Sequence, residues 1–255
     1  MAVGIEKFNH CYNSIQSFPT LTAYCMLYIM QVAQVDSPNV SVDGVVFQLI
    51  ADDLFVLLVK RKGEPFIGYW ALPSMPVPAG ESTLSVTKRC LEIKAGINRR
   101  KLRSVEQLYT FDNLDGDPRG PLLSVTYMGL GRNITPKASQ TTEGPLFFAV
   151  DELPDDLIPA HHEIINYALG RLRSRLIDTN NVFALLPELF TLSSLQNAYQ
   201  TILGQTFDKR NFRKKFLGLD LLVATQEYIQ EGAHRPAKLY RFKQQKVEDL
   251  VRTFV

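Results

Sequence analysis

The chain has 255 residues, 45% of them hydrophobic and 21% charged, which is an ordinary globular composition and argues against a disordered chain. This length accommodates two domains or one large one. The net charge of +2 is unevenly divided: from Thr191 onwards there are 11 basic and 6 acidic residues, whereas the preceding part has 17 basic and 20 acidic ones. The basic C-terminal part indicates either a polyanionic partner or a solvated basic surface.

The first 36 residues form an N-terminal extension. Its apolar run at 21–35 contains polar residues and is shorter than the roughly 20 residues that a membrane span needs. The segment before the run is polar and has no Arg or Lys cluster, which makes it a poor signal peptide. We expect residues 1–36 to pack on the body or to be partly disordered, and a true start at Met30 is an open alternative.

Cysteine and histidine usage gives no sign of a metal site. Cys11, Cys25 and Cys90 show neither metal-ligand spacing nor a disulfide framework, and they fit the reducing cytoplasm, where we expect the protein to act. The pair His161-His162 has no cysteine nearby, so we interpret it as structural.

Residues 37–177 alternate between strand-like and helix-like patterns. Two runs rich in Val, Leu and Phe flank the turn Ala51-Asp52-Asp53, which predicts a pair of strands. Ser82 is a good N-cap and Gly96 a good C-cap for a central helix. The expected elements are strands at 40–50 and 54–60, a helix from 82 to 95, strands at 105–111, 122–129 and 147–150, and a helix at 163–176. This order favours an α/β/α sandwich around a mixed sheet.

Residues 178–190 form the predicted linker, at which the sign of the charge changes. After it, Ser193 and Gln196 have the spacing of a capping box, and Gly204 ends the apolar pattern of a helix. The expected elements that follow are a basic helix at 209–217 and two strands at 221–229 and 238–242. This order predicts a winged helix-turn-helix domain over 191–255, and an α+β fold for the whole chain.

The segment 80–97 has the frame of a known motif. Residues in register with the Nudix signature, Gly-x5-Glu-x7-Arg-Glu-U-x-Glu-Glu-x-Gly-U with U aliphatic, are Glu81, Arg89, Leu91, Gly96 and Ile97. The chain departs from the signature at its opening glycine, where Met75 stands, and at all three glutamates of the second half. Their positions carry Cys90, Ile93 and Lys94.

The missing glutamates bear directly on chemistry. Carboxylates that share a helix face hold the Mg²⁺ ions with which Nudix hydrolases activate water and neutralise a pyrophosphate. A thiol, an isoleucine and an ammonium group cannot do this, and Lys94 would repel a metal ion. We therefore expect a scaffold that binds a ligand without cleaving it, with no metal and no cofactor.

The basic helix at 209–217 has two different faces. At about 100° per residue, Phe212 and Phe216 lie on one side, and Arg210, Asn211 and Lys214 lie on the other. Arg and Lys contact phosphates, and Arg and Asn read base edges, so this composition suits a recognition helix, although a solvated basic helix looks similar. The predicted DNA-binding residues are Lys209, Arg210, Asn211, Arg213, Lys214, Lys215, Arg235 and Lys238.

Together the two halves resemble the NrtR-type transcriptional regulators, which join a Nudix-like domain to a C-terminal winged helix. The resemblance covers about residues 40–245 and is carried by segments 43–47, 57–61, 68–73, 117–120 and 151–154 in the body, and 189–192, 212–215 and 235–242 in the tail. It implies a homodimer that binds an operator in double-stranded DNA, usually as a repressor. Many members control NAD metabolism and sense ADP-ribose or a related nucleotide, and others respond to a sugar such as arabinose.

The effector site is expected in the Nudix-like domain, with Arg61, Trp70, Phe111 and Arg119 as the candidate ligand-binding residues. Each of these has a structural alternative: core packing for the two aromatic residues, and for Arg119 an ion pair with Asp115 or Asp117. The linker is the expected place of coupling between effector and DNA, as the one connection between body and tail.

Two other functions stay open from the sequence. Some relatives hydrolyse ADP-ribose, and Glu81 with Glu92 could supply a rearranged metal site for a nucleoside diphosphate hydrolase. A protein-protein adaptor built on an inactive Nudix fold is the second alternative. Neither reading involves a membrane.

Overall fold

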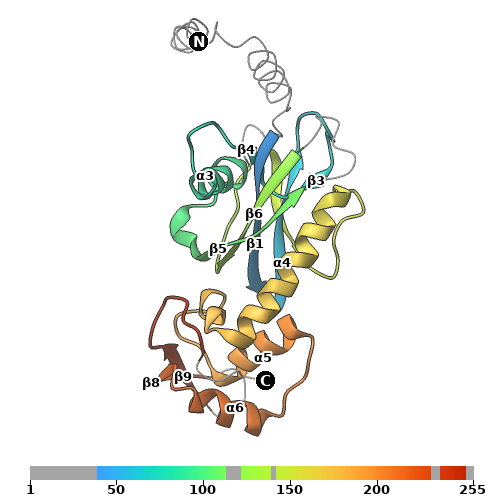
Figure 1. The fold of residues 1–255 in the computed structure, drawn as a ribbon. Helices are drawn as coiled ribbons and strands as arrows, with labels where there is room; N and C mark the ends of the chain where they lie inside the picture. Colours follow the sequence, from blue (N-terminus) through green and yellow to red (C-terminus); the bar gives the residue numbers. More distant parts are fainter. Residues whose placement is uncertain (1–38, 113–121, 139–141, 231–235, 251–255) are drawn as a thin grey trace, which may run out of the picture. The chain divides into compact units, whose positions relative to one another are not determined.

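The computed structural model describes residues 39–112, 122–138, 142–230 and 236–250 (Figure 1). The N-terminal extension, the loop with Arg119 and the hairpin tip with Arg235 lie outside these ranges, so the predictions made for them are not addressed. Residues Asn39–Val255 cluster as one compact unit. Within the described ranges, no helix is long and apolar enough to cross a membrane.

Within the described residues, seven strands form one mixed sheet, which has the five predicted strands and two short ones, β3 and β4, that were not predicted. Their bounds are β1 Asn39–Ile50, β2 Asp53–Arg61, β3 Trp70–Ala71, β4 Ser74–Pro76, β5 Leu102–Asp112, β6 Leu122–Gly131 and β7 Thr142–Ala149. β1 and β6 are parallel, and every other pairing in the sheet is antiparallel. β1 and β2 are joined by a two-residue turn, Ala51-Asp52, in which both residues have positive φ, 49° and 71°. Two successive positive φ values match the twist of a tight hairpin.

Two neighbouring strands of the sheet, β1 and β2, separate along part of their length. β1 and β2 pair only next to their shared turn, over 47–50 and 53–56. Further along, this edge of β1 pairs with β4, and the matching edge of β2 pairs with β3. Leu72 and Pro73 are the only residues between β3 and β4, so the chain crosses from one side of the opening to the other there.

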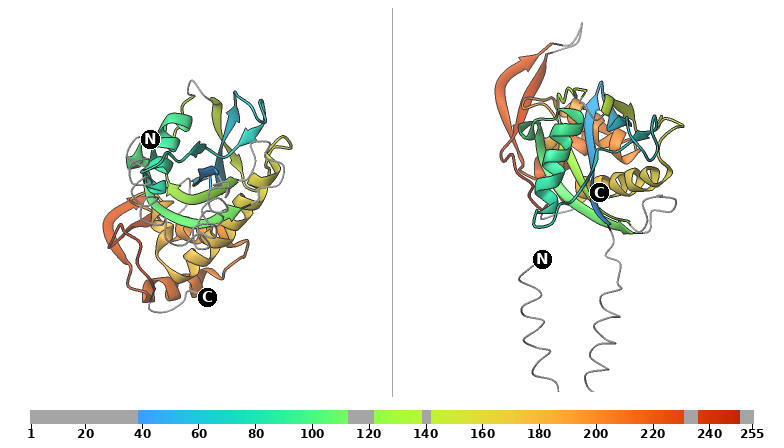
Figure 2. Two further views of the ribbon diagram at one scale, coloured as in Figure 1. Left: turned by 45° about the horizontal axis from the view of Figure 1, so that its top comes forward. Right: turned by 90° about the horizontal axis from the view of Figure 1, so that it is seen from above.

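Helices α3 (Thr83–Ala95) and α4 (Pro159–Asp178) lie on opposite sides of the sheet (Figures 1 and 2). Both predicted caps of α3 are confirmed: Ser82 accepts a hydrogen bond from the backbone NH of Ser85, and Gly96 has a φ of 64°. α3 approaches β1 closely, since a Cβ added to Gly44 would lie 2.9 Å from a methyl carbon of Leu91. α4 begins four residues before the predicted position because Pro159 fits the first turn of a helix.

The tail contains α5 (Leu192–Leu203), α6 (Lys209–Gly218) and a hairpin of β8 (Leu222–Ile229) and β9 (Ala237–Phe242). The predicted capping box at Ser193 and Gln196 is wrong. Thr191, in extended conformation, is the N-cap and exchanges hydrogen bonds with Ser194. The helix starts two positions earlier than an N-cap at Ser193 would set it. Gln196 instead donates to the Phe207 carbonyl at 2.8 Å, which ties α5 to the turn before α6.

Aromatic side chains hold α5 and α6 together. Tyr199 is fully buried and contacts the rings of Phe212 and Phe216 edge to face, with centroids 5.7 and 5.5 Å away. Its hydroxyl donates to the carbonyl of Leu176, 3.2 Å away, at the end of α4. This packing fixes which face of α6 remains exposed.

Residues 178–190, predicted as a linker, are folded and largely buried. They include the 3-10 helix η2 (Asn181–Ala184), and the hydrophobic cluster that holds Phe47 of β1 also holds Phe183 of η2 and Tyr199 of α5. The expectation that this segment is the one connection between body and tail is wrong. Arg173 of α4 donates to the Ile202 carbonyl of α5 at 2.8 Å, which adds a contact outside the segment.

Candidate functional site

The exposed face of α6 is basic. Asp208 caps the helix by accepting from the NH of Asn211, and Phe212 and Phe216 turn inward, as the spacing predicts. The helix residues left exposed are Lys209, Arg210, Asn211, Lys214, Lys215, Leu217 and Gly218. Burial of the phenylalanine pair thus places four cations and one amide on the solvent side of a short helix.

A groove adjoins this face. It has a volume of about 600 Å³ and lies between the start of α5, α6 and the hairpin. Its basic lining residues are Lys209, Arg213 and Lys238. Arg213 is half buried and donates to the hydroxyl of Ser193 at 3.1 Å, so it is held against the first turn of α5. The Lys238 ammonium lies 6.0 Å from the ring centroid of Tyr228. A groove that combines cations with a helix N-terminus suits a phosphate backbone.

The helix that carries the Nudix frame, α3, has Cys90, Ile93 and Lys94 at three glutamate positions of the signature. Glu81 accepts two hydrogen bonds from Arg89, at 2.5 and 3.1 Å, so these two residues that match the signature bind each other. Ile93 is 44% exposed, at one of the glutamate positions. Within the described part of the chain, no group of three or more His, Cys, Asp or Glu residues could hold a metal ion.

Cys90, at the first of the three positions where the signature has a glutamate and this chain does not, faces the core. It is 1% exposed and packs with Val42 and Val86. Burial raises the pKa of its thiol well above the ordinary value, and the charge of Asp43 adds to the effect. The side chain is therefore a neutral, apolar packing group at neutral pH.

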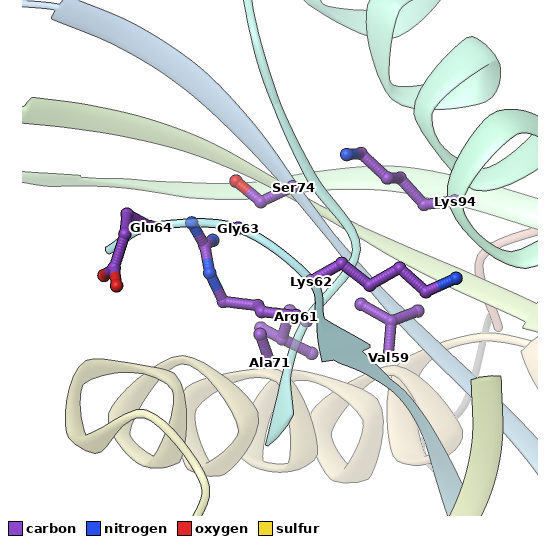
Figure 3. A pocket seen from close by; sticks show the side chains of 9 residues that line it. Val59, Arg61, Lys62, Gly63, Glu64, Ala71, Ser74 and Lys94 are labelled. Carbon is purple, nitrogen blue, oxygen red and sulfur yellow. The ribbon is translucent and has the colours of Figure 1, made fainter. Parts of the chain in front are cut away.

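A cleft opens where β1 and β2 separate, between β3 and β4. It has a volume of about 340 Å³, and Val59, Arg61, Lys62, Gly63, Glu64, Ala71, Leu72, Ser74 and Lys94 line it (Figure 3). Three basic side chains and one acidic one give this lining a net charge of +2. The cleft is thus suited to an anion rather than to a cation or a neutral molecule.

The four predicted ligand-binding residues have different positions. Arg61 lines the cleft. Trp70 does not, because neighbouring strand residues point to opposite faces: Ala71 lines the cleft, while the Trp70 ring packs on Phe148 at 4.8 Å. Phe111 is buried against Tyr109 and Tyr167 and is not part of this lining either. A role in ligand binding stays a prediction for all four residues, including Arg119.

Eight of the nine lining residues were not predicted as ligand-binding, among them Lys62, Ser74 and Lys94. Lys62 follows Arg61 directly, and the run Lys60-Arg61-Lys62 is a sequence signal for a cationic strand end. Lys94 occupies a glutamate position of the signature, and its positive charge argues against a bound metal ion there. Its position in the cleft could have been predicted from the register of the motif.

Comparisons with known proteins decide the family. A family model described as the NrtR DNA-binding winged helix domain matches residues 182–242. The chain is 33% identical over 213 residues to the ADPR responsive transcriptional repressor NtrR of Acinetobacter baylyi, covering 81% of this chain and 82% of that protein. The chain belongs to the NrtR family.

Two further proteins are similar to this NrtR family member. The crystal structure of Shewanella oneidensis NrtR complexed with a 27mer DNA superimposes with a TM-score of 0.69 at 27% identity, covering 84% of this chain and 98% of that one. The ADP-ribose pyrophosphatase of Methanocaldococcus jannaschii is 33% identical over 130 residues, or 50% of this chain and 71% of that protein. The predicted fold, a Nudix-like body followed by a winged helix, is confirmed.

Proposed function

We propose that this chain is a repressor that binds operator DNA through its tail, and whose affinity for DNA changes when ADP-ribose or a related nucleotide binds in the body. The Acinetobacter relative is an ADPR responsive repressor, and the Shewanella structure holds DNA. The observation that carries the proposal is the pairing of two cationic surfaces within one unit: the α6 face with its groove, and the cleft beside α3.

The charge of the cleft favours a nucleotide over a sugar. Arabinose is neutral, so it offers no negative charge for the three basic side chains to pair with. A nucleoside diphosphate carries its negative charge on the group that Arg61, Lys62 and Lys94 suit. Of the two effector classes that the resemblance implies, the phosphate-bearing one fits this lining.

We also propose that the chain does not hydrolyse its effector. Its pyrophosphatase relative makes hydrolysis the competing function. However, the side chains at the three glutamate positions are a buried thiol, an exposed isoleucine and a cleft-lining ammonium group. The rearranged site of Glu81 and Glu92 is disfavoured, because Glu81 is already bound to Arg89 through both oxygens.

The DNA-binding role is proposed for the basic residues of the tail. Arg210, Asn211 and Lys214 have the exposure that a major-groove contact requires, and Lys209, Arg213 and Lys238 line the adjoining groove. The protein would act as a homodimer, since an operator with two-fold symmetry presents two half-sites. The cytoplasmic location predicted from the cysteines is part of the same proposal.

The test begins with selection of a binding sequence from a random duplex library by the full-length protein. Fluorescence anisotropy then measures its affinity for that duplex with and without ADP-ribose, and with arabinose as the comparison. The proposal expects sequence-specific binding that ADP-ribose shifts and arabinose does not. Failure to enrich any sequence would contradict the DNA-binding role, and an equal affinity with and without ADP-ribose would exclude it as effector.

A further inference from the structure

Lys94 places a positive charge at a position of the Nudix frame where the signature has a negative one. It stands where the signature has a glutamate, in the last turn of α3, and its side chain extends from the helix toward Ser74 of β4 (Figure 3). Lys94 is half buried, whereas its neighbours Glu92 and Ile93 are exposed. The helix therefore directs a cation into the space where other Nudix proteins concentrate negative charge.

The backbone around Lys94 favours this cation. The carbonyl end of a helix carries a partial negative charge, which stabilises an ammonium group in the last turn. Gly96 ends the helix with a φ of 64°, and Ala95 is buried against the sheet, so the turn that carries Lys94 is fixed. The helix turn that carries Lys94 is thus a fixed part of the cleft wall.

Arg61 and Lys62 extend the positive charge across the cleft. They stand at the end of β2, on the other side of the opening from Ser74 of β4. The lining has a net charge of +2, which equals the charge of one divalent cation. In a metal-dependent site, Mg²⁺ supplies this positive charge to a diphosphate.

We propose that Lys94, with Arg61 and Lys62, replaces the divalent metal, so that the cleft binds a nucleoside diphosphate in its metal-free form. The proposal rests on the proposed function, because it takes the cleft to be the effector site. It adds the chemical state of the ligand and names Lys94 as the residue that determines it. A tethered ammonium neutralises the diphosphate but does not activate water, so the ligand is bound and left intact.

The decisive measurement is calorimetric titration of ADP-ribose into the full-length protein, once in EDTA and once in excess Mg²⁺. ADP is titrated in parallel as the simplest nucleoside diphosphate. We expect binding in EDTA that is at least as strong as in Mg²⁺, because Mg²⁺ competes with the lysines for the diphosphate. A metal-dependent site would show the opposite order.

Variants assign the effect to Lys94. Lys94→Gln should weaken binding in EDTA by about ten- to a hundredfold, the range for loss of one charge-assisted hydrogen bond. Lys94→Arg keeps the charge and should retain most of the affinity. Lys88→Gln is the matched control, because it removes a lysine from the same helix that does not line the cleft. Equal melting temperatures of the variants exclude a general loss of folding.

The outcomes separate the two proposals. Binding that disappears in EDTA, or that is the same in Lys94→Gln and wild type, overturns the metal-replacement inference. If ADP binds with the predicted dependence on Lys94 and ADP-ribose does not bind, the inference stands and the assignment of ADP-ribose as effector fails. If neither diphosphate binds in either buffer, the inference fails together with the nucleotide-effector part of the proposed function, while the DNA-binding part is tested separately.

Discussion

The hydroxyl of Thr201 in α5 donates a hydrogen bond to the backbone carbonyl of Asp52, with 2.8 Å between the two oxygens. The Asp52 carboxylate also accepts from Asn197, one turn earlier on α5, at 3.2 Å. Asp52 lies in the turn at one end of β2, and Arg61 at the other end of β2 lines the cleft. A single strand therefore connects the proposed effector site with the helix that packs behind α6.

This connection predicts that Thr201→Val reduces coupling between effector and DNA. The variant removes the hydrogen bond to Asp52 and leaves the cleft and the α6 face unchanged. We expect each ligand to bind alone as in wild type, and the coupling free energy to fall by about 0.5–2 kcal/mol. The measurement is operator affinity with and without ADP-ribose. Thr206→Val, at an exposed position after α5, is the control, and unchanged coupling in Thr201→Val would show that the signal takes another route.

The exposed residues of α6 should make two kinds of contact with DNA, some with bases and others with phosphates. Arg210→Ala should lose about 1–3 kcal/mol of operator binding and relax specificity at one position of each half-site, if this residue reads a base. Lys215→Ala should weaken all sequences alike and lower the slope of affinity against salt by about one. Titrations at several salt concentrations distinguish the two effects. Normal binding by both variants would mean that α6 is not the recognition helix.

Tyr199 should matter for stability through both its ring and its hydroxyl. Tyr199→Phe keeps the ring contacts but removes the donor to the Leu176 carbonyl, which should lower the free energy of unfolding by about 1 kcal/mol. Tyr199→Leu also removes the ring contacts with Phe212 and Phe216, and it should lower that free energy further. Urea denaturation followed by circular dichroism gives both values. Equal stability of wild type and Tyr199→Phe would show that this hydrogen bond contributes nothing net.

The Cys90 thiol should be unreactive in the native protein. Its pKa is raised by burial and by Asp43, so at pH 8 it stays protonated, whereas an ordinary thiol with a pKa of about 8.5 is partly ionised. A raised pKa lowers the fraction of thiolate, and only the thiolate reacts with disulfide reagents, so the reaction should be slow. In a variant with Cys11→Ser and Cys25→Ser, we expect reaction with a chromogenic disulfide only after unfolding in urea. Rapid labelling of the native variant would contradict the burial of Cys90.

Local signals explain which elements could be predicted from the sequence. The caps at Ser82 and Gly96 and the inward phenylalanines of α6 depend on neighbours within one or two turns, so the pattern of residue types was enough. The β1–β2 turn is likewise a local feature. The cap of α5 was placed wrongly because two overlapping polar pairs competed, and only the backbone at Thr191 shows which one forms.

Non-local contacts explain what could not be predicted. The cleft exists because β1 and β2 separate and two short strands occupy their free edges, and no periodicity in two- or three-residue strands reveals this. The direction of Trp70 depends on the pairing of β3 with β2. The bond from Thr201 to Asp52 joins residues 149 positions apart, beyond the reach of any local pattern.

The setting of Cys90 limits which side chains this position can hold. A glutamate placed here would bring a carboxylate into the apolar space between Val42 and Val86, where an unpaired charge is strongly destabilising. Substitution of Cys90 alone therefore cannot give this helix a metal-binding carboxylate. An engineered hydrolase on this scaffold would need changes in the core around position 90 before it could use a glutamate there.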